Sequence, residues 1–190
     1  MIHKIYRHPA RSEVGADARD TPMLITIEAL DDAQLSDAAA ISEKARPFNA
    51  RLHTYSTDEL HQFQAKPDHH VLGVRIANRS LDLGLIGCLV CHAEEEDFVA
   101  DSFIVADQFL GFGIEYAMVR ALSDVALSCG CGAVVLLLAQ SEDNYAARAF
   151  YDSLGLTFET VPSGELELAF PSLAADAVIT ISEAQAHRKM

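Results

Sequence analysis

The clearest periodicity in the chain lies between residues 113 and 129, where apolar side chains recur at helical spacing. A stripe of this kind predicts an amphipathic helix with one buried face. A short apolar run, Phe103–Val105, ends just before it and is typical of a buried strand. The pattern therefore predicts strand, turn and helix in direct succession. The stripe comprises Ile114, Met118, Val119 and Leu122.

The remaining pattern alternates between strand-like and helix-like segments. We expect strands at 24–27, 70–77, 83–92, 98–105, 133–138, 156–161, 166–170 and 178–181. We expect helices at 31–45, 57–64, 113–129 and 145–154, the first capped by Asp31 and the second by a Ser56/Glu59 capping box. Three of the strands follow one another at meander spacing. Helices mixed with a mostly antiparallel sheet predict an α+β fold.

The domain organisation follows from length and from where the pattern begins. Residues 1–23 show no periodicity, and we expect them to form a flexible N-terminal arm. Residues 24–190 have the length of one domain with a sizeable core, so we expect a single domain there.

Two glycines, Gly111 and Gly113, lie where the central helix opens. Glycine allows the backbone to approach a bound group closely. The unpaired N–H groups of a first helical turn, together with the helix dipole, favour an anion. A glycine pair also marks ordinary tight turns, so this feature alone leaves both interpretations open.

Charge narrows the choice of partners. The formal net charge is −14, which argues against nucleic acid and against an anionic membrane surface. The N-terminus lacks the apolar stretch of a signal peptide, and no apolar run approaches the roughly 20 residues of a membrane span. We therefore expect a cytoplasmic protein.

The four cysteines invite a zinc interpretation that their context disfavours. Cys88 and Cys91 lie in a predicted strand, where residues three apart point to opposite faces. Cys129 and Cys131 lie at a predicted helix end. We expect reduced, buried thiols and no metal site.

Two motifs resemble those of GCN5-related N-acetyltransferases, the GNAT family. Gln108-x-x-Gly111-x-Gly113 is similar to the family's Q/R-x-x-G-x-G/A loop, and about thirty residues later Asn144-x-x-Ala147-x-x-Phe150-Tyr151 resembles N-x-x-A-x-x-F-Y. The resemblance implies the GNAT fold, an acyl-CoA donor such as acetyl-CoA, and a small-molecule acceptor.

Within that family, residues 24 to about 181 look similar to the C-terminal GNAT-like domain of FkbH-like proteins. This implies a role in polyketide or other natural-product biosynthesis, with an acyl carrier protein as partner. Two features depart from the pattern: a dehalogenase-type domain is not encoded here, and Asp107 stands where an acyl-carrying cysteine is expected. The similar pieces include Pro47–Asn49 with Tyr55, Pro67–Leu72, Leu83–Gly87, Asp101–Val105, Leu110–Glu115, Phe150–Gly155 and Leu166–Ala169.

The GNAT resemblance also implies roles for individual residues. The backbone of Ile104 and Val105 would pair with the pantetheine amides, Asn144 would orient the cofactor arm, and Tyr151 would protonate the leaving thiolate. Asp101 is the first candidate base, followed by Asp107 and Glu115. The pyrophosphate would lie on the loop formed by Gln108, Phe109, Leu110, Gly111, Phe112 and Gly113.

Each of these roles has a structural alternative. Asn144 could be only a helix N-cap, Tyr151 only a core aromatic, and Asp101 only a solvated acid. We interpret the histidines, including His53, His69 and His70, as surface or satisfied residues.

Three functions remain open from the sequence. The first is an acyl-CoA-dependent acyltransferase that acts on an amine or hydroxyl. The second is an acyltransferase that works with an acyl carrier protein. The third is a non-catalytic module with the same fold. A homodimer is compatible with each of them.

Overall fold

The computed structural model describes residues 3–7, 24–78, 80–155, 159–160 and 166–171. Within these residues one mixed sheet runs in the order β1-β2-β3-β4-β5-β6-β8-β7. Neighbouring strands are antiparallel except β5 and β6, which are parallel, and the α+β prediction is confirmed. The strands are β1 His3–Arg7, β2 Leu24–Ala29, β3 His69–Ala77, β4 Asp82–Glu94, β5 Asp97–Val105, β6 Ala133–Leu138, β7 Glu159–Thr160 and β8 Leu166–Pro171.

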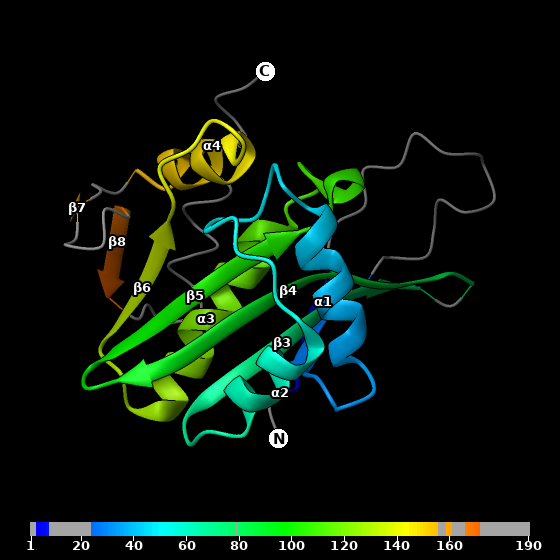
Figure 1. The fold of residues 1–190 in the computed structure, drawn as a ribbon, viewed down its shortest axis with the longest axis horizontal. Helices are drawn as coiled ribbons and strands as arrows, with labels where there is room; N and C mark the ends of the chain where they lie inside the picture. The colour runs from blue at the N-terminus through cyan, green and yellow to red at the C-terminus, as the bar shows by residue number, and fades with distance from the viewer. Residues whose placement is uncertain (1–2, 8–23, 79, 156–158, 161–165, 172–190) are drawn as a thin grey trace.

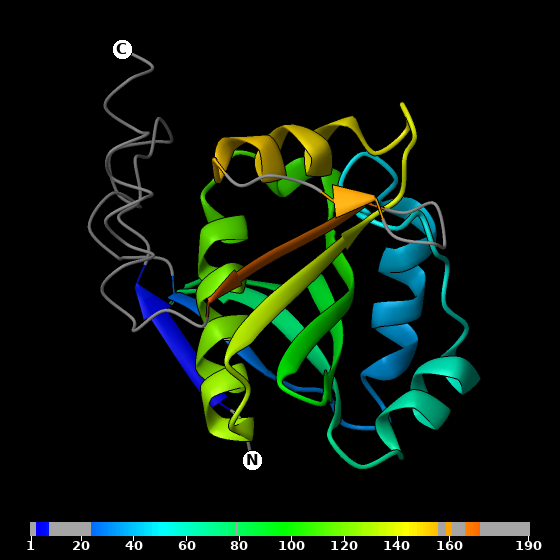
Figure 2. The ribbon, with the colours of Figure 1, turned by 90° about the vertical axis from the view of Figure 1, so that its left-hand side faces the viewer.

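Helices cover both faces of the sheet (Figures 1 and 2). The helices α1 Leu35–Lys44 and α2 Thr57–Gln64 lie over one face, and α3 Ile114–Cys129 lies over the other. The fourth helix, α4 Tyr145–Ser153, follows β6 and lies beyond the end of that strand. Among the described helices, none has the length and apolar content that crossing a bilayer requires.

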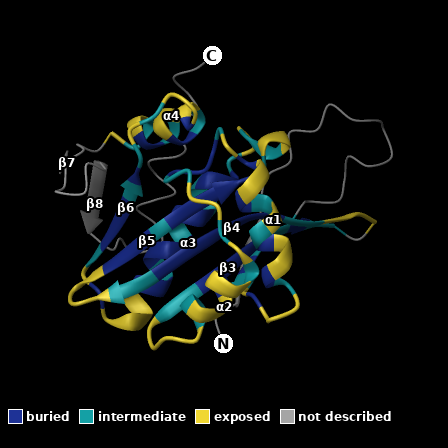
Figure 3. Ribbon diagram, viewed as in Figure 1, coloured by how far each residue is buried: buried dark blue, intermediate teal, exposed yellow. Residues whose placement is uncertain are grey.

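The central strands are largely buried (Figure 3). They carry two apolar clusters, one on each face, because successive side chains of a strand alternate between faces. Leu89 belongs to the large cluster under α3, while its neighbours Cys88 and Val90 belong to the cluster under α1 and α2. The predicted stripe of α3 is buried as expected, from Ile114 to Leu122. Burial on both faces explains why the central strands read as continuous apolar runs.

Several predicted elements match the structure within two residues. Helix α2 begins at the predicted capping box, in which Glu59 N–H donates to Ser56 Oγ and Ser56 N–H donates to Glu59 Oε2. The acidic run between β4 and β5 is exposed, as expected for a hairpin tip. Strand β6 has its predicted bounds.

The start of the first helix was predicted wrongly. The helix begins at Leu35, four residues after the predicted cap. Asp31 and Gln34 instead bond to each other's backbone N–H groups at 3.0 Å, which stabilises a turn ahead of the helix. Asp and Gln side chains that satisfy a turn compete with helix formation at the same residues.

The expectation of a flexible arm is wrong for one stretch of residues 1–23. His3–Arg7 form β1, which pairs with β2 and so covers backbone groups that would otherwise form an open edge. A strand of five residues is too short to show a clear alternation in sequence. The rest of 1–23 and the predicted strand at 178–181 lie outside the described residues, as does all of 156–161 except Glu159–Thr160.

Candidate functional site

Strands β5 and β6 separate part-way along their length. Their parallel pairing ends at Ala100 and Leu136, while β5 continues to Val105. The separation coincides with a β-bulge, because the register with β4 skips Asp101. The edge of β5 that faces β6 is therefore open to another chain segment beyond Ala100.

Residues 47–50, which we name the gap segment, occupy this opening. Val105 N–H donates to Phe48 O at 3.0 Å, and Ala50 N–H donates to Phe103 O at 3.1 Å. These two bonds form an antiparallel bridge between Asn49 and Ile104. The gap segment thus takes the place of a neighbouring strand along β5.

The other side of the gap segment is bonded to β6 and α4. Ala50 O accepts from Ala139 N–H at 2.9 Å and from Asn144 Nδ2 at 2.7 Å. Pro47 O accepts from the first-turn N–H groups of α4, at Ala146 and Ala147. The α1–α2 connection, cyan in Figure 2, accordingly lies beside the end of β6 and close to α4.

Asn49 fixes the gap segment through its side chain. Its Nδ2 donates to Ser42 O at 3.2 Å and to His53 O at 2.8 Å, and the residue is buried. Phe48 is also buried, with its ring 5.5 Å from that of Phe103. The segment is therefore anchored by both polar and apolar contacts.

The predicted phosphate loop has the backbone that an anion site needs. Gly111 and Gly113 adopt φ values of +80° and +76°, a left-handed conformation that disfavours other residues. Gly113 is the N-cap of α3 and has no side chain to bond the first-turn N–H groups. A Cβ at Gly111 would meet nothing within 4 Å, so space lies beside the loop. This backbone fits the phosphates of a coenzyme A group.

A carboxylate already bonds this loop. Glu115, in the first turn of α3, is buried and accepts from Gly111 N–H at 3.1 Å. The sequence placed Glu115 only third among candidate bases. A negative charge near a helix N-terminus is favourable, so Glu115 competes for the same partial positive charge that a phosphate would bind.

The other predicted loop residues lie around this backbone. Gln108 and Phe112 are exposed, whereas Phe109 and Leu110 pack against the large apolar cluster. Ile104 is fully buried under α1 and α2, and Val105 is buried under α3.

The predicted acid, Tyr151, lies inside an aromatic cluster. It is fully buried, with its ring 6.1 Å from Phe103 and 6.0 Å from Phe150. Burial raises the pKa of Tyr151, so the phenol stays protonated at neutral pH. The environment suits a proton donor, and it is also that of a core aromatic.

Asn144 occupies the N-cap position of α4, but its side chain bonds other backbone segments instead of the helix. Its Nδ2 donates to Ala50 O and, at 2.9 Å, to Ala139 O, and no side-chain cap bond is formed. Its Oδ1 is buried without a hydrogen-bond partner. In this conformation the side chain joins the gap segment to the end of β6.

Asp101, the first candidate base, is not a solvated acid. Its Oδ2 lies 2.6 Å from His92 Nδ1, and its Oδ1 lies 3.4 Å from Arg51 Nη1. Sequence reasoning missed His92, although it follows Cys88 and Val90 on one face of the strand next to β5. The two-residue spacing of Cys88, Val90 and His92 places them on one face of β4. Because the predicted meander sets this strand beside β5, the spacing could have indicated that His92 lies near Asp101.

The cysteines do not converge on a metal. Cys88 and Cys91 lie in opposite apolar clusters, and burial raises the pKa of Cys88 to about 12. Cys129, expected to be buried, is exposed because it ends α3 on its solvent side. In the part of the chain that the structure describes, no group of three potential ligands is arranged to hold a metal ion.

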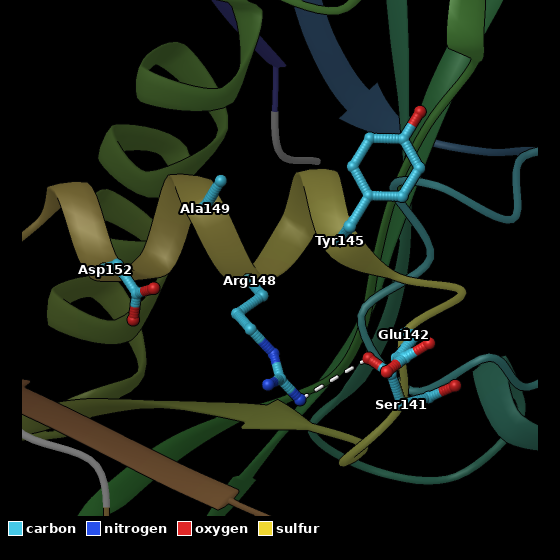
Figure 4. Close-up of a pocket in the computed structure, with 6 residues that line it drawn as sticks. All are labelled: Ser141, Glu142, Tyr145, Arg148, Ala149 and Asp152. Atoms are coloured by element: carbon cyan, nitrogen blue, oxygen red, sulfur yellow. Dashed lines mark hydrogen bonds between the residues drawn. The ribbon is translucent and has the colours of Figure 1, made fainter.

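A surface pocket of about 260 Å³ lies elsewhere, along α4 (Figure 4). Arg148 crosses it, with Nη2 donating to Ser141 O at 3.4 Å. None of the predicted site residues lines this pocket, so it does not mark the candidate site. Its lining consists of Ser141, Glu142, Tyr145, Arg148, Ala149 and Asp152.

A comparison with protein families finds a match that includes both the glycine loop and α4. A family model described as "Acetyltransferase (GNAT) family" matches residues 38–156, which is more than half of the chain. The chain belongs to the GNAT family. GNAT enzymes use acetyl-CoA as acyl donor, so the GNAT, enzyme and cofactor predictions are confirmed at this level. The finer resemblance to FkbH-like proteins stays a prediction.

Solved GNAT structures share this fold at low sequence identity. The ribosomal-protein-S18-alanine N-acetyltransferase from Escherichia coli is 19% identical, with a TM-score of 0.59 over 80% of this chain and 96% of that chain. The PaiA N-acetyltransferase from Thermoplasma acidophilum, in complex with coenzyme A, is 14% identical, with a TM-score of 0.61 over 77% and 98%. The spermidine N-acetyltransferase from Vibrio cholerae, in complex with CoA and spermine, is 15% identical, with a TM-score of 0.58 over 78% and 95%.

A search of curated proteins finds no match. At these identities the structural likenesses concern the fold.

Proposed function

We propose that this chain transfers an acetyl group from acetyl-CoA to an amine or hydroxyl of a small molecule. The observation that supports it most is the opening of α3 by two left-handed glycines without a side-chain cap, within the family match. Backbone N–H groups in such a turn, with the helix dipole, bind phosphate in the absence of basic side chains.

The residues from Gln108 to Gly113 are proposed to hold the pyrophosphate, with Asn144 orienting the pantetheine arm. When bound, the thioester would supply an activated acyl carbon. Tyr151, kept protonated by burial, is proposed to give a proton to the leaving sulfur. Most of the rate gain in such a transfer comes from positioning the two reactants.

The gap segment adds a conformational requirement to this proposal. The edge of β5 at Ile104 and Val105 was predicted to bind the arm, and Val105 N–H is already bonded to Phe48 O. That edge becomes available only when the gap segment leaves it. Release exposes the buried ring of Phe48 and breaks the bonds at Ala50, so the closed form opposes binding.

A second candidate is an FkbH-like acyltransferase that takes its acyl group from an acyl carrier protein. The stretch 107–115 contains two acids and no Lys or Arg, which suits one phosphodiester better than the several phosphates of coenzyme A. A natural-product pathway, suggested by the FkbH-like resemblance, belongs to this candidate.

A third candidate is a non-catalytic GNAT-fold module. The closed gap and the enclosed Tyr151 favour it. The charge of −14 argues against nucleic acid and membrane partners for all three. A homodimer and a cytoplasmic location stay predictions.

The test is thiol release from acetyl-CoA by the purified chain with a panel of small amines and alcohols. Acceptor-dependent thiol release supports the first candidate. Transfer only from an acetylated carrier protein supports the second. Coenzyme A binding without transfer from either donor supports the third and contradicts the enzyme proposals.

A further inference from the structure

A histidine–carboxylate pair lies on the sheet face under α2, outside the predicted loop. His92 of β4 has its Nδ1 2.6 Å from Asp101 Oδ2, which is short for a hydrogen bond and typical of a charge-assisted one. Because a carboxylate only accepts, Nδ1 carries the proton. The other ring nitrogen, Nε2, is then free to accept a proton.

The side chain of His92 is partly exposed, with 19% of its surface accessible. Its Nε2 lies 3.7 Å from Glu94 Oε2, on a side chain that is 70% exposed. The ring of His69, from β3, stacks on His92 at 4.8 Å, and Phe63 of α2 meets it edge-on at 6.1 Å. Arg51 lies on the far side of Asp101. The imidazole is thus contacted by Asp101, His69 and Phe63, and part of its side chain stays accessible to a ligand.

The pair lies where β5 and β6 begin to separate. Asp101 directly follows Ala100, the last β5 residue paired with β6, and it is the residue that the bulge inserts. The next residue, Ser102, bonds Tyr55 OH at 2.9 Å, from the same connection that carries Arg51. The polar groups of this face therefore flank the start of the gap.

We propose that His92 removes the proton from a cationic amine acceptor, with Asp101 as the positioning residue that fixes its tautomer. This inference rests on the proposed acetyl transfer. The two carboxylate oxygens of Asp101 already contact His92 and Arg51, so His92 is the group of the pair that is proposed to meet the acceptor. His92 contacts the acceptor and is a catalytic residue in this proposal.

The negative charges near His92 favour a cationic amine as the acceptor. Asp101 and Glu94 are carboxylates near His92, and the chain carries a net charge of −14, which attracts cations. An alkylammonium has a pKa near that of lysine, about 10.4, so it must lose a proton before its nitrogen attacks.

An acceptor R–NH₃⁺ loses two protons during the transfer. The ammonium gives one proton to His92 Nε2, which passes it to water. The amine nitrogen then forms a C–N bond to the thioester carbon, and the C–S bond breaks with its electron pair on sulfur. The second nitrogen proton ends on that sulfur, giving an amide and a thiol.

The first test needs no turnover. Nitrogen-15 NMR of the histidine side chains in the full chain is expected to show the Nδ1–H tautomer for the neutral ring of His92. Asp101→Asn is expected to shift the tautomer ratio. A proton on Nε2 in the neutral ring of wild type would overturn the assignment.

The second test separates the proton step from the acyl step. With acetyl-CoA, His92→Gln is expected to lower kcat/KM for butylamine by about 10²–10⁴-fold. Transfer to hydroxylamine, which is unprotonated at neutral pH, should change by only a few fold. Imidazole in solution should restore butylamine transfer to His92→Gly. His61→Gln, an exposed histidine beside Asp32, is the control.

Equal loss for both nucleophiles, or no loss for butylamine, overturns the role of His92 and leaves acetyl transfer intact. Wild type that transfers to neither nucleophile contradicts the proposed function, and the inference with it.

Discussion

The backbone N–H of Val105 donates a 3.0 Å hydrogen bond to the carbonyl oxygen of Phe48. The bond joins the end of β5 to the α1–α2 connection, across residues distant in sequence. It closes the strand edge that the sequence assigned to the cofactor. Cofactor binding along this edge and closure by the gap segment are therefore competing states of the same backbone.

Weakening the gap segment should tighten cofactor binding. Asn49→Ala removes two hydrogen bonds that anchor the segment, each worth about 0.5–1.5 kcal/mol. A closed state destabilised by about 1.4 kcal/mol raises the affinity for coenzyme A about tenfold. Calorimetry measures the affinity, and amide hydrogen exchange at Val105 and Ala50 reports release of the segment. Phe48→Ala is less suitable, because losing a buried Phe costs about 3–5 kcal/mol.

Asn78→Ala is the matched control. Asn78 Oδ1 accepts from two backbone N–H groups in the β3–β4 turn, far along the chain from the gap. The Asn78→Ala variant should lose a comparable amount of unfolding free energy while its affinity for coenzyme A stays unchanged. Unchanged affinity in Asn49→Ala, or protection of Val105 that persists with coenzyme A bound, would contradict competition.

The buried carboxylate of Glu115 should oppose phosphate binding. Glu115→Gln keeps an oxygen that accepts from Gly111 N–H and removes the negative charge. The affinity for coenzyme A should rise by about 5–30-fold, which corresponds to roughly 1–2 kcal/mol of charge repulsion. Glu96→Gln, at the exposed hairpin tip, gives the same change in net charge and should leave the affinity unchanged. A weaker affinity in Glu115→Gln would show that the carboxylate supports the site.

Tyr151→Phe should separate catalysis from binding. The substitution preserves the packing against Phe103 and Phe150 and removes only the hydroxyl. Turnover should fall by about 10²-fold or more if the phenol protonates the leaving sulfur, while coenzyme A affinity changes little. Tyr145→Phe, exposed on the same helix, is the control. Equal turnover of the two variants would identify Tyr151 as a core aromatic only.

Tyr55 should make stability sensitive to alkaline pH. Burial is the main cause that raises the pKa of Tyr55 from 10.0 to about 12. The unfolded chain therefore loses this proton first, so the contribution is present below pH 10 and is lost as pH rises to about 12. Its size is on the order of 2–3 kcal/mol.

Denaturant unfolding at several pH values checks this. Between pH 10 and 12, Tyr55→Phe should lose less unfolding free energy than wild type. Tyr151 and the buried thiols titrate in both proteins, so the difference isolates Tyr55. Parallel stability profiles for the two proteins would contradict the assignment.

Helices were predicted well where neighbouring residues along the chain determine the structure. The capping box at Ser56 and Glu59 and the buried stripe of α3 rest on residues three or four apart, and both are confirmed. The start of α1 was predicted wrongly because an Asp side chain such as that of Asp31 can stabilise either a turn or a helix N-terminus. The pairing of His3–Arg7 with β2 left no periodic trace in five residues.

The candidate site depended more on contacts between distant segments. The glycines of the loop were predictable because a left-handed backbone selects glycine locally. The bond between Val105 and Phe48, and the pairing of His92 with Asp101, require the register of separate strands and connections. Single-residue propensities carry no information on these contacts.

We propose that the loop from Gln108 to Gly113 binds acetyl-CoA, and calorimetric titration measures this binding. The titration compares wild type with Gly111→Glu and with Gly84→Glu. Both glycines have a left-handed φ and open space beside them, so both variants carry the same backbone strain and the same added charge. We expect acetyl-CoA to bind wild type and Gly84→Glu but not Gly111→Glu. Equal binding by all three proteins, or no binding to wild type, would contradict it.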